Sequence, residues 1–186
     1  MNRSQTALLH AKEPQDSAFC ASPVLPTTQL AENRLEAVRE AVDAILLNCP
    51  DPLQVRDGAV HLYGVAQACA LIALRRGEDA ELAAIAGMLH DLSTYADAYT
   101  PDHAARSAAL ARTLLRRLAL FSAEEIEQVC AAIACHSEKA QVHTAFAEVL
   151  LDADVLQHGL YNPTLFLLEE EVARFRALQE EFSLAR

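Results

Sequence analysis

Apolar side chains recur every three or four positions along most of the chain after residue 28, and this spacing predicts a succession of amphipathic helices. We see no segment with the strict alternation of a half-buried strand, and no internal repeat. We therefore expect an all-α fold, a single compact domain of about six to seven helices. Five of the expected helices span residues 29–48, 57–76, 78–91, 144–157 and 164–184. The fourth and fifth helices are expected to begin near residues 100 and 122.

Residues with strong end preferences mark several helix limits. The two prolines that follow Asn48 are expected to end the first helix, and Gly77 suits the left-handed cap that ends the second. Pro101 is predicted to occupy the first position of the fourth helix. Ser122 and Glu125 have the spacing of a capping box, which predicts the start of the fifth.

The N-terminal segment differs in composition from the rest of the chain. Residues 1–27 hold three prolines among Ser, Thr and Gln and lack helical periodicity, so we expect a loose arm, to which we assign no chemistry. Residues 28–186 are expected to form the helical domain.

Charge excludes one class of partner. The formal net charge is −11 and the sequence pI is about 5.0, which argues against the broad basic surface that binds duplex nucleic acid. A local basic pocket for a small phosphorylated molecule remains compatible with this charge.

Cysteine usage and hydropathy favour a soluble, cytoplasmic protein. Five cysteines are an odd number, and three of them lie within apolar helical pattern, where reduced thiols pack as small apolar groups. The most apolar window, residues 65–74, is too short to span a bilayer, so we expect no membrane partner.

Two polar residues, His90 and Asp91, interrupt the end of an apolar helical run at residues 81–92. Burying an imidazole and a carboxylate without partners costs several kcal/mol, so a polar group must meet them. Adjacent residues on a helix diverge by about 100°, so both can reach one ion only if it lies between them or the helix ends there. A divalent metal ion would satisfy them, and these donors suit Mn, Fe, Ni, Co, Zn or Mg.

The chain carries the series H…HD…H…D at His61, His90, Asp91, His136 and Asp154. This series resembles the HD superfamily of metal-dependent phosphohydrolases, and the resemblance covers roughly residues 55–160. The helical contexts are similar too: HLYGVAQACALIALRRG, ELAAIAGMLHDL, CAAIACHSE and LLDADVL. The resemblance implies an all-helical domain with a metal in its core, held by His61, His90, Asp91 and Asp154.

Two further histidines, His103 and His136, extend this set. Each begins an i, i+3 helical pair with a cation, Arg106 and Lys139 respectively. Some superfamily members bind two metals through six ligands, among them cyclic-dinucleotide phosphodiesterases and di-iron oxygenases. We favour two ions here, with Asp91 as the bridging carboxylate. In the alternative, the two histidines only orient the substrate.

We therefore expect a metal-dependent phosphohydrolase in which water activated by one or two divalent ions attacks a small phosphorylated substrate, a nucleotide or a phosphate ester. Asp91, Arg106 and Lys139 are the expected catalytic side chains. The alternatives are a di-iron oxygenase and a non-catalytic nucleotide-binding HD module. The chain lacks the Gly-Tyr-Pro signature of one phosphodiesterase group, and Thr94 replaces the Glu that assists water attack in the nucleotidase branch.

Four other features receive lesser roles. Asp152 is expected at most to contact a ligand residue or the substrate, and His158, four residues after Asp154, is a possible partner of that carboxylate. Arg76 is expected to interact with the C-terminal dipole of its helix. The acidic run at residues 169–171 predicts a solvated helix face.

Overall fold

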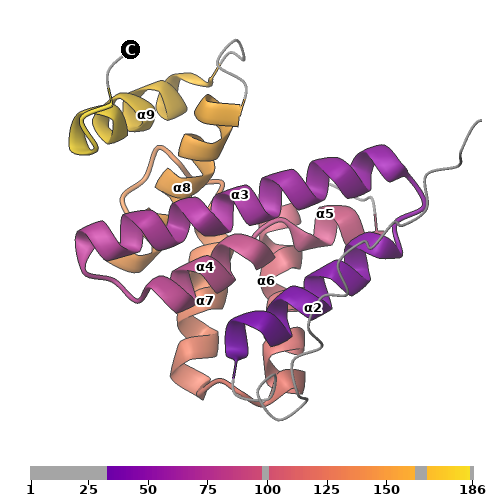
Figure 1. The fold of residues 1–186 in the computed structure, drawn as a ribbon. Helices are drawn as coiled ribbons and strands as arrows, with labels where there is room; N and C mark the ends of the chain where they lie inside the picture. Colours follow the sequence, from indigo (N-terminus) through magenta and orange to yellow (C-terminus); the bar gives the residue numbers. More distant parts are fainter. Residues whose placement is uncertain (1–32, 98–100, 162–166, 185–186) are drawn as a thin grey trace, which may run out of the picture.

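The computed structural model describes residues 33–97, 101–161 and 167–184, and every regular element in these ranges is an α-helix (Figure 1). The all-α prediction is therefore confirmed. The expected arm at residues 1–27 lies outside the described residues. The helices are α2 (Arg34–Leu47), α3 (Pro52–Arg76), α4 (Ala80–Leu89), α5 (Leu92–Asp97), α6 (His103–Leu118), α7 (Ala123–Cys135), α8 (Ala145–Tyr161) and α9 (Glu169–Glu181).

The second helix starts five residues earlier than expected. Pro52 opens α3, and the side chain of Asp51 accepts a hydrogen bond from the backbone N–H of Leu53 at 2.9 Å. A proline at the first helical position lacks only an N–H that has no partner within the helix, so it begins a helix as readily as it ends one. We had interpreted Pro52 only as a terminator.

The start of α6 also differs from the prediction. Pro101 lies in a turn, and the N-cap is Asp102 in the left-handed conformation with φ 54°. The helix begins at His103, which places this imidazole in its first turn. Two other signals are confirmed: Gly77 ends α3 with φ 79°, and the Ser122 capping box opens α7.

Two non-helical residues, His90 and Asp91, separate α4 from α5. The helix α4 ends at Leu89, and the short helix α5, which we had not predicted, follows Asp91 directly. Ser93 holds α5 against α6, since its backbone N–H donates to Ser107 Oγ at 3.1 Å and its hydroxyl donates to His103 O at 3.2 Å. The helix therefore ends before His90 and Asp91, which is one of the two arrangements that let both reach one ion.

The long helix α3 crosses the middle of the molecule and packs chiefly on α4 and α8 (Figure 1). Gly87 of α4 makes this contact close: a Cβ atom there would lie 2.7 Å from Ala66 Cα. By length and composition α3 could cross a membrane. One face of this helix lies in the core, where Leu62, Val65 and Ile72 are fully buried, whereas Leu71 and Leu74 on another face are exposed.

Candidate metal centre

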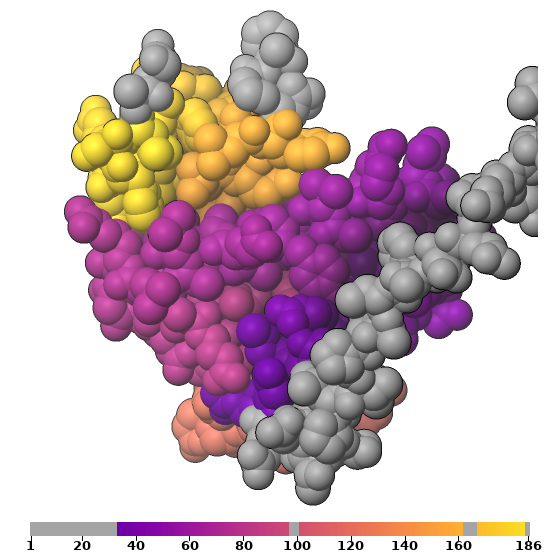
Figure 2. All heavy atoms as spheres, in the orientation of Figure 1, coloured from indigo at the N-terminus to yellow at the C-terminus, as the bar shows by residue number. Residues whose placement is uncertain are grey.

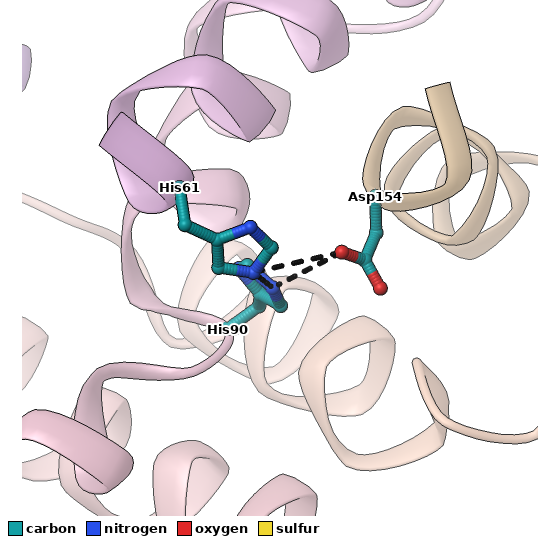
Figure 3. A group of neighbouring side chains, drawn as sticks. All are labelled: His61, His90 and Asp154. Carbon is teal, nitrogen blue, oxygen red and sulfur yellow. Dashed lines mark hydrogen bonds and ion pairs between the residues drawn. The ribbon is translucent and has the colours of Figure 1, made fainter. Parts of the chain in front are cut away.

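Residues from two helices and from the end of a third meet in the core. His61 comes from the middle of α3, His90 from the end of α4, and Asp154 from α8 (Figure 3). The two Nε2 atoms of His61 and His90 lie 3.1 Å apart. Asp154 Oδ1 lies 3.6 Å from His61 Nε2 and 3.7 Å from His90 Nε2. These three residues form one group of potential metal ligands.

Asp91 connects this group to a second one. Its Oδ2 atom lies 3.5 Å from His61 Nε2 and 3.6 Å from His90 Nε2. Its Oδ1 atom instead lies 3.2 Å from His136 Nε2 and 3.5 Å from His103 Nε2. The two oxygens of one carboxylate thus face two different pairs of imidazoles, an arrangement in which a carboxylate can bridge two cations.

Hydrogen bonds at Nδ1 orient three of these imidazoles. His90 Nδ1 lies 2.8 Å from Gly87 O, His136 Nδ1 lies 2.8 Å from Ile133 O, and His61 Nδ1 lies 3.0 Å from Gln157 Oε1. All three acceptors are oxygens that carry no proton, so Nδ1 bears the hydrogen. In the neutral rings the Nε2 lone pairs then point into the central space, as is usual for histidines that bind metals.

Both carboxylates are ionised in this setting. Burial opposes the charge of Asp91, but in the metal-free site protons on the neighbouring rings of His90, His136 and His61 outweigh it and lower its pKa well below the usual range. Burial likewise opposes ionisation of Asp154, and His90 together with the Lys139 ammonium keeps its pKa well below the ordinary value.

The donor set fits a divalent metal ion. Asp91 Oδ1 and Asp154 Oδ1 are buried and receive no hydrogen bond from any described residue. When Nδ1 carries the hydrogen in both rings, the Nε2 atoms of His61 and His90, which lie 3.1 Å apart, each present a lone pair to the other. These lone pairs repel each other unless a cation lies between them. Metal–ligand bonds of about 2.1 Å place neighbouring ligand atoms roughly 3.0–3.5 Å apart, close to the spacing of these atoms. Neutral imidazoles and ionised carboxylates are the donors such an ion requires.

The structure distributes the other predicted residues around this centre. Lys139 Nζ lies 2.6 Å from Asp154 Oδ2. Arg106 lies on α6, one turn after His103. Asp152 does not face the imidazoles, because its side chain pairs with Arg76 of α3 and with an arginine of α9. Arg76 thus joins two helices rather than only capping its own.

Three polar contacts at the site were missed or left open by the sequence. Gln157 accepts the hydrogen bond from His61, and Ser137 Oγ lies 3.0 Å from His103 Nε2. His158 stacks on His61 with ring centroids 5.3 Å apart, and its Nε2 atom lies 3.5 Å from Asp154 Oδ1. Gln157 and His158 follow Asp154 by three and four positions. Residues at this spacing lie on the same face of a helix as Asp154, so the sequence did contain a signal for both.

Comparison with known proteins agrees with this geometry. The HD domain family matches residues 58–159, more than half of the chain. The crystal structure of a predicted HD superfamily hydrolase from an uncultured Thermotogales bacterium has a similar fold, with a TM-score of 0.56 and 24% sequence identity over 86% of this chain and 96% of the other. No curated protein matches the sequence. The family match, on a segment that carries the complete H…HD…H…D series, shows that the chain belongs to the HD domain family.

Proposed function

We propose that the protein is a metal-dependent phosphohydrolase that acts on a small phosphorylated molecule, a nucleotide or a phosphate ester. The observation that carries this proposal is the placement of Asp91 between two pairs of imidazoles, with each carboxylate oxygen facing one pair. Membership of the HD domain family supports it, and so does the likeness in fold to a protein described as a hydrolase.

In this proposal six side chains hold one or two divalent ions, and two is the number that the geometry around Asp91 favours. When bound, such ions lower the pKa of a water molecule and neutralise charge on a phosphoryl group. The residues assigned to them are His61, His90, Asp91, His103, His136 and Asp154.

The centre has an open side at His103 and Asp91, whose side chains are 36% and 22% exposed, whereas that of His90 is fully buried. The side chain of His158, beside Asp154, is also 36% exposed. We assign the substrate to the His103 side because Arg106 follows His103 on α6. Asp91, which borders this side, is assigned to positioning the attacking water. Arg106, one turn along α6 from His103, is assigned to the substrate's negative charge.

Lys139 is suited to a phosphoryl oxygen by its unused donor. An ammonium group has three N–H donors. Among the described residues, Lys139 Nζ donates to Asp154 Oδ2 at 2.6 Å and to His136 O at 3.3 Å, which leaves a third N–H for substrate. A point charge beside the metal centre stabilises charge that develops on the phosphoryl group.

Metal analysis followed by a phosphate-release screen tests the proposal. The purified protein is expected to hold divalent metal and to release phosphate from at least one nucleotide or sugar phosphate. Asp91→Asn is expected to abolish release, whereas Asp57→Asn, an exposed control on α3, is not. A metal-loaded protein that releases no phosphate from any of these compounds would contradict the proposal.

A di-iron oxygenase is the second candidate, because six nitrogen and oxygen donors around a shared carboxylate also suit a pair of iron ions. Iron-dependent oxygen consumption, without phosphate release, would favour this candidate over the hydrolase.

A further inference from the structure

The C-terminal helix α9 lies beyond the segment matched by the HD domain family, yet two of its side chains reach the neighbours of Asp154. Figure 2 shows α9 beside α8, on one side of α3. We propose that Arg174 and Glu171 of α9 are positioning residues that hold Lys139 and His158 against the two oxygens of Asp154. This inference rests on the proposed metal centre, and on no particular substrate.

Arg174 holds the loop that carries Lys139. Its Nε atom donates to the carbonyl oxygen of Lys139 at 2.8 Å, and its Nη2 atom donates to that of Gln141 at 3.0 Å. Its Nη1 atom donates to Glu148 at 2.6 Å and to Asp152 at 2.8 Å. The side chain is only 14% exposed. One guanidinium thus ties a loop without helical hydrogen bonds to two carboxylates of α8.

The loop in turn delivers Lys139 to the metal centre. The Lys139 ammonium lies 2.6 Å from Asp154 Oδ2. The other oxygen of that carboxylate, Oδ1, is directed at the imidazoles of His61 and His90. The Lys139 side chain is 10% exposed. Rotation of the Asp154 carboxylate is therefore restricted before any ion binds.

Glu171 acts on the opposite side of the same carboxylate. Its Oε1 atom lies 3.4 Å from His158 Nδ1, and the other nitrogen of that ring lies 3.5 Å from Asp154 Oδ1. Glu171 is buried, so the expected solvated face is wrong at this residue, whereas Glu169 and Glu170 are exposed as expected. His158 also stacks on His61, so Glu171 influences the position of two imidazoles through one.

The helix α9 packs closely enough on α8 to hold Glu171 and Arg174 in place. A Cβ atom at Gly159 of α8 would lie 2.3 Å from the Phe175 ring of α9, so the two helices are in direct contact there. Arg76 at the end of α3 pairs with Glu181 at 2.7 Å and with Asp152 at 2.8 Å. These contacts fix the middle and the C-terminal end of the helix, and Arg174 directly precedes Phe175.

The decisive variant is Arg174→Lys, measured by titration of the metal-free full-length protein with Mn²⁺. Lysine keeps the charge, but one ammonium cannot span two carbonyls and two carboxylates. Loss of such supporting contacts typically weakens metal binding about 10–100-fold, and we expect at least tenfold here. Arg176→Lys is the matched control, because Arg176 is exposed on the same helix and its replacement should leave Mn²⁺ affinity unchanged.

A purely structural role for Arg174 predicts a different result: a lower melting temperature with the wild-type Mn²⁺ affinity, which would overturn the inference. Glu171→Gln provides a second test if Arg174→Lys does not fold. It is expected to weaken Mn²⁺ binding relative to Glu170→Gln, which removes the same charge from an exposed neighbour. Equal affinities in these two variants would also overturn it.

A crystal structure of metal-free Arg174→Lys separates this inference from the proposed function. We expect the Lys139 ammonium to have left Asp154 Oδ2; an unchanged ion pair would refute the role of Arg174. Failure of the wild-type protein to bind Mn²⁺ or to release phosphate would instead count against the proposed function, since the crystallographic test needs neither metal nor substrate.

Discussion

His90 and His136 occupy equivalent positions at the ends of two helices. Each is the C-cap residue, of α4 and α7 respectively, and each has its Nδ1 atom 2.8 Å from a carbonyl oxygen three residues earlier. The last carbonyls of a helix lack the usual i+4 donors, so an imidazole N–H can bond to one of them and is oriented by it. Ile133 O also accepts the backbone N–H of His136, at 3.3 Å. The same local structure thus directs two Nε2 atoms at the two oxygens of Asp91.

His90→Ala is expected to remove metal binding altogether, because His90 Nε2 faces both Asp91 and Asp154 at the centre of the site. Metal content of the purified variant, measured by mass spectrometry, checks this. His143→Ala is the control, since the hydrogen bond and ion pair given for that ring are both to Glu138, away from the metal centre. Wild-type metal content in His90→Ala would contradict the assignment.

Removal of the metal should lower the melting temperature. An ion that binds only the folded state at 100 times its dissociation constant stabilises by about 2.7 kcal/mol. For a chain of this size that corresponds to roughly 5–10 °C. The ion also relieves the repulsion between the lone pairs of His61 and His90. Calorimetry of the protein before and after chelation tests this, and identical melting curves would argue against a buried site.

Acid should weaken metal binding through the imidazoles rather than the carboxylates. The pKa values of Asp91 and Asp154 are well below the usual range, so both stay ionised in weak acid. Burial lowers the pKa of His61, but the carboxylates of Asp91 and Asp154 outweigh this effect, so the pKa of His61 is raised above its usual value of 6.5. Protons and metal compete for this ring, so affinity is full at high pH and falls as pH drops through the raised pKa. Below that pKa, each proton that the metal must displace lowers the apparent metal affinity about tenfold per pH unit. Mn²⁺ titrations from pH 8 to 5.5 that show constant affinity would contradict this.

The sequence was most informative where local chemistry decides the structure. His90 and Asp91 stood out because a polar pair has no packing role in an apolar run, and the Ser122 capping box satisfies backbone groups within one turn. Pro52 was misinterpreted because a proline is compatible with both the end and the start of a helix. Local pattern therefore located the candidate ligands, but only some of the helix limits.

The contacts of α9 could not be predicted in this way. Arg174 bonds to the carbonyl oxygens of Lys139 and Gln141, which are distant in sequence and carry no pattern of their own. Glu171 belongs to an acidic run whose composition indicates exposure, yet it is buried and lies 3.4 Å from His158 of α8. Such residues become recognisable only from the packing of whole helices.

The close contact of α3 and α4 should make Gly87→Ala destabilising. The added Cβ atom would lie 2.7 Å from Ala66 Cα and 2.8 Å from Ala66 N, so backbone rather than a flexible side chain must move. We expect a loss of about 1–3 kcal/mol in the free energy of unfolding, measured by urea denaturation. Gly64→Ala is the control: its Cβ meets only the side chain of Gln157, so a much smaller change is expected. Equal stability of the two variants would show that α4 can shift away from α3.

The number of metal ions can be decided at His103 and His136, which face Asp91 Oδ1 on the side away from His61. If both bind a second ion, replacing either with Ala should reduce the metal content from about two ions per chain toward one, as expected for a two-metal site. If they only orient substrate, metal content should stay constant while turnover falls. Arg106→Ala should then give the same phenotype as the histidine variants through a lost phosphate contact. We expect the first outcome, because Asp91 Oδ1 is buried and receives no hydrogen bond from the described residues, which leaves it available to a cation. A wild-type protein that never holds more than one ion per chain, with Mn, Fe or Ni in excess, would exclude the two-metal arrangement.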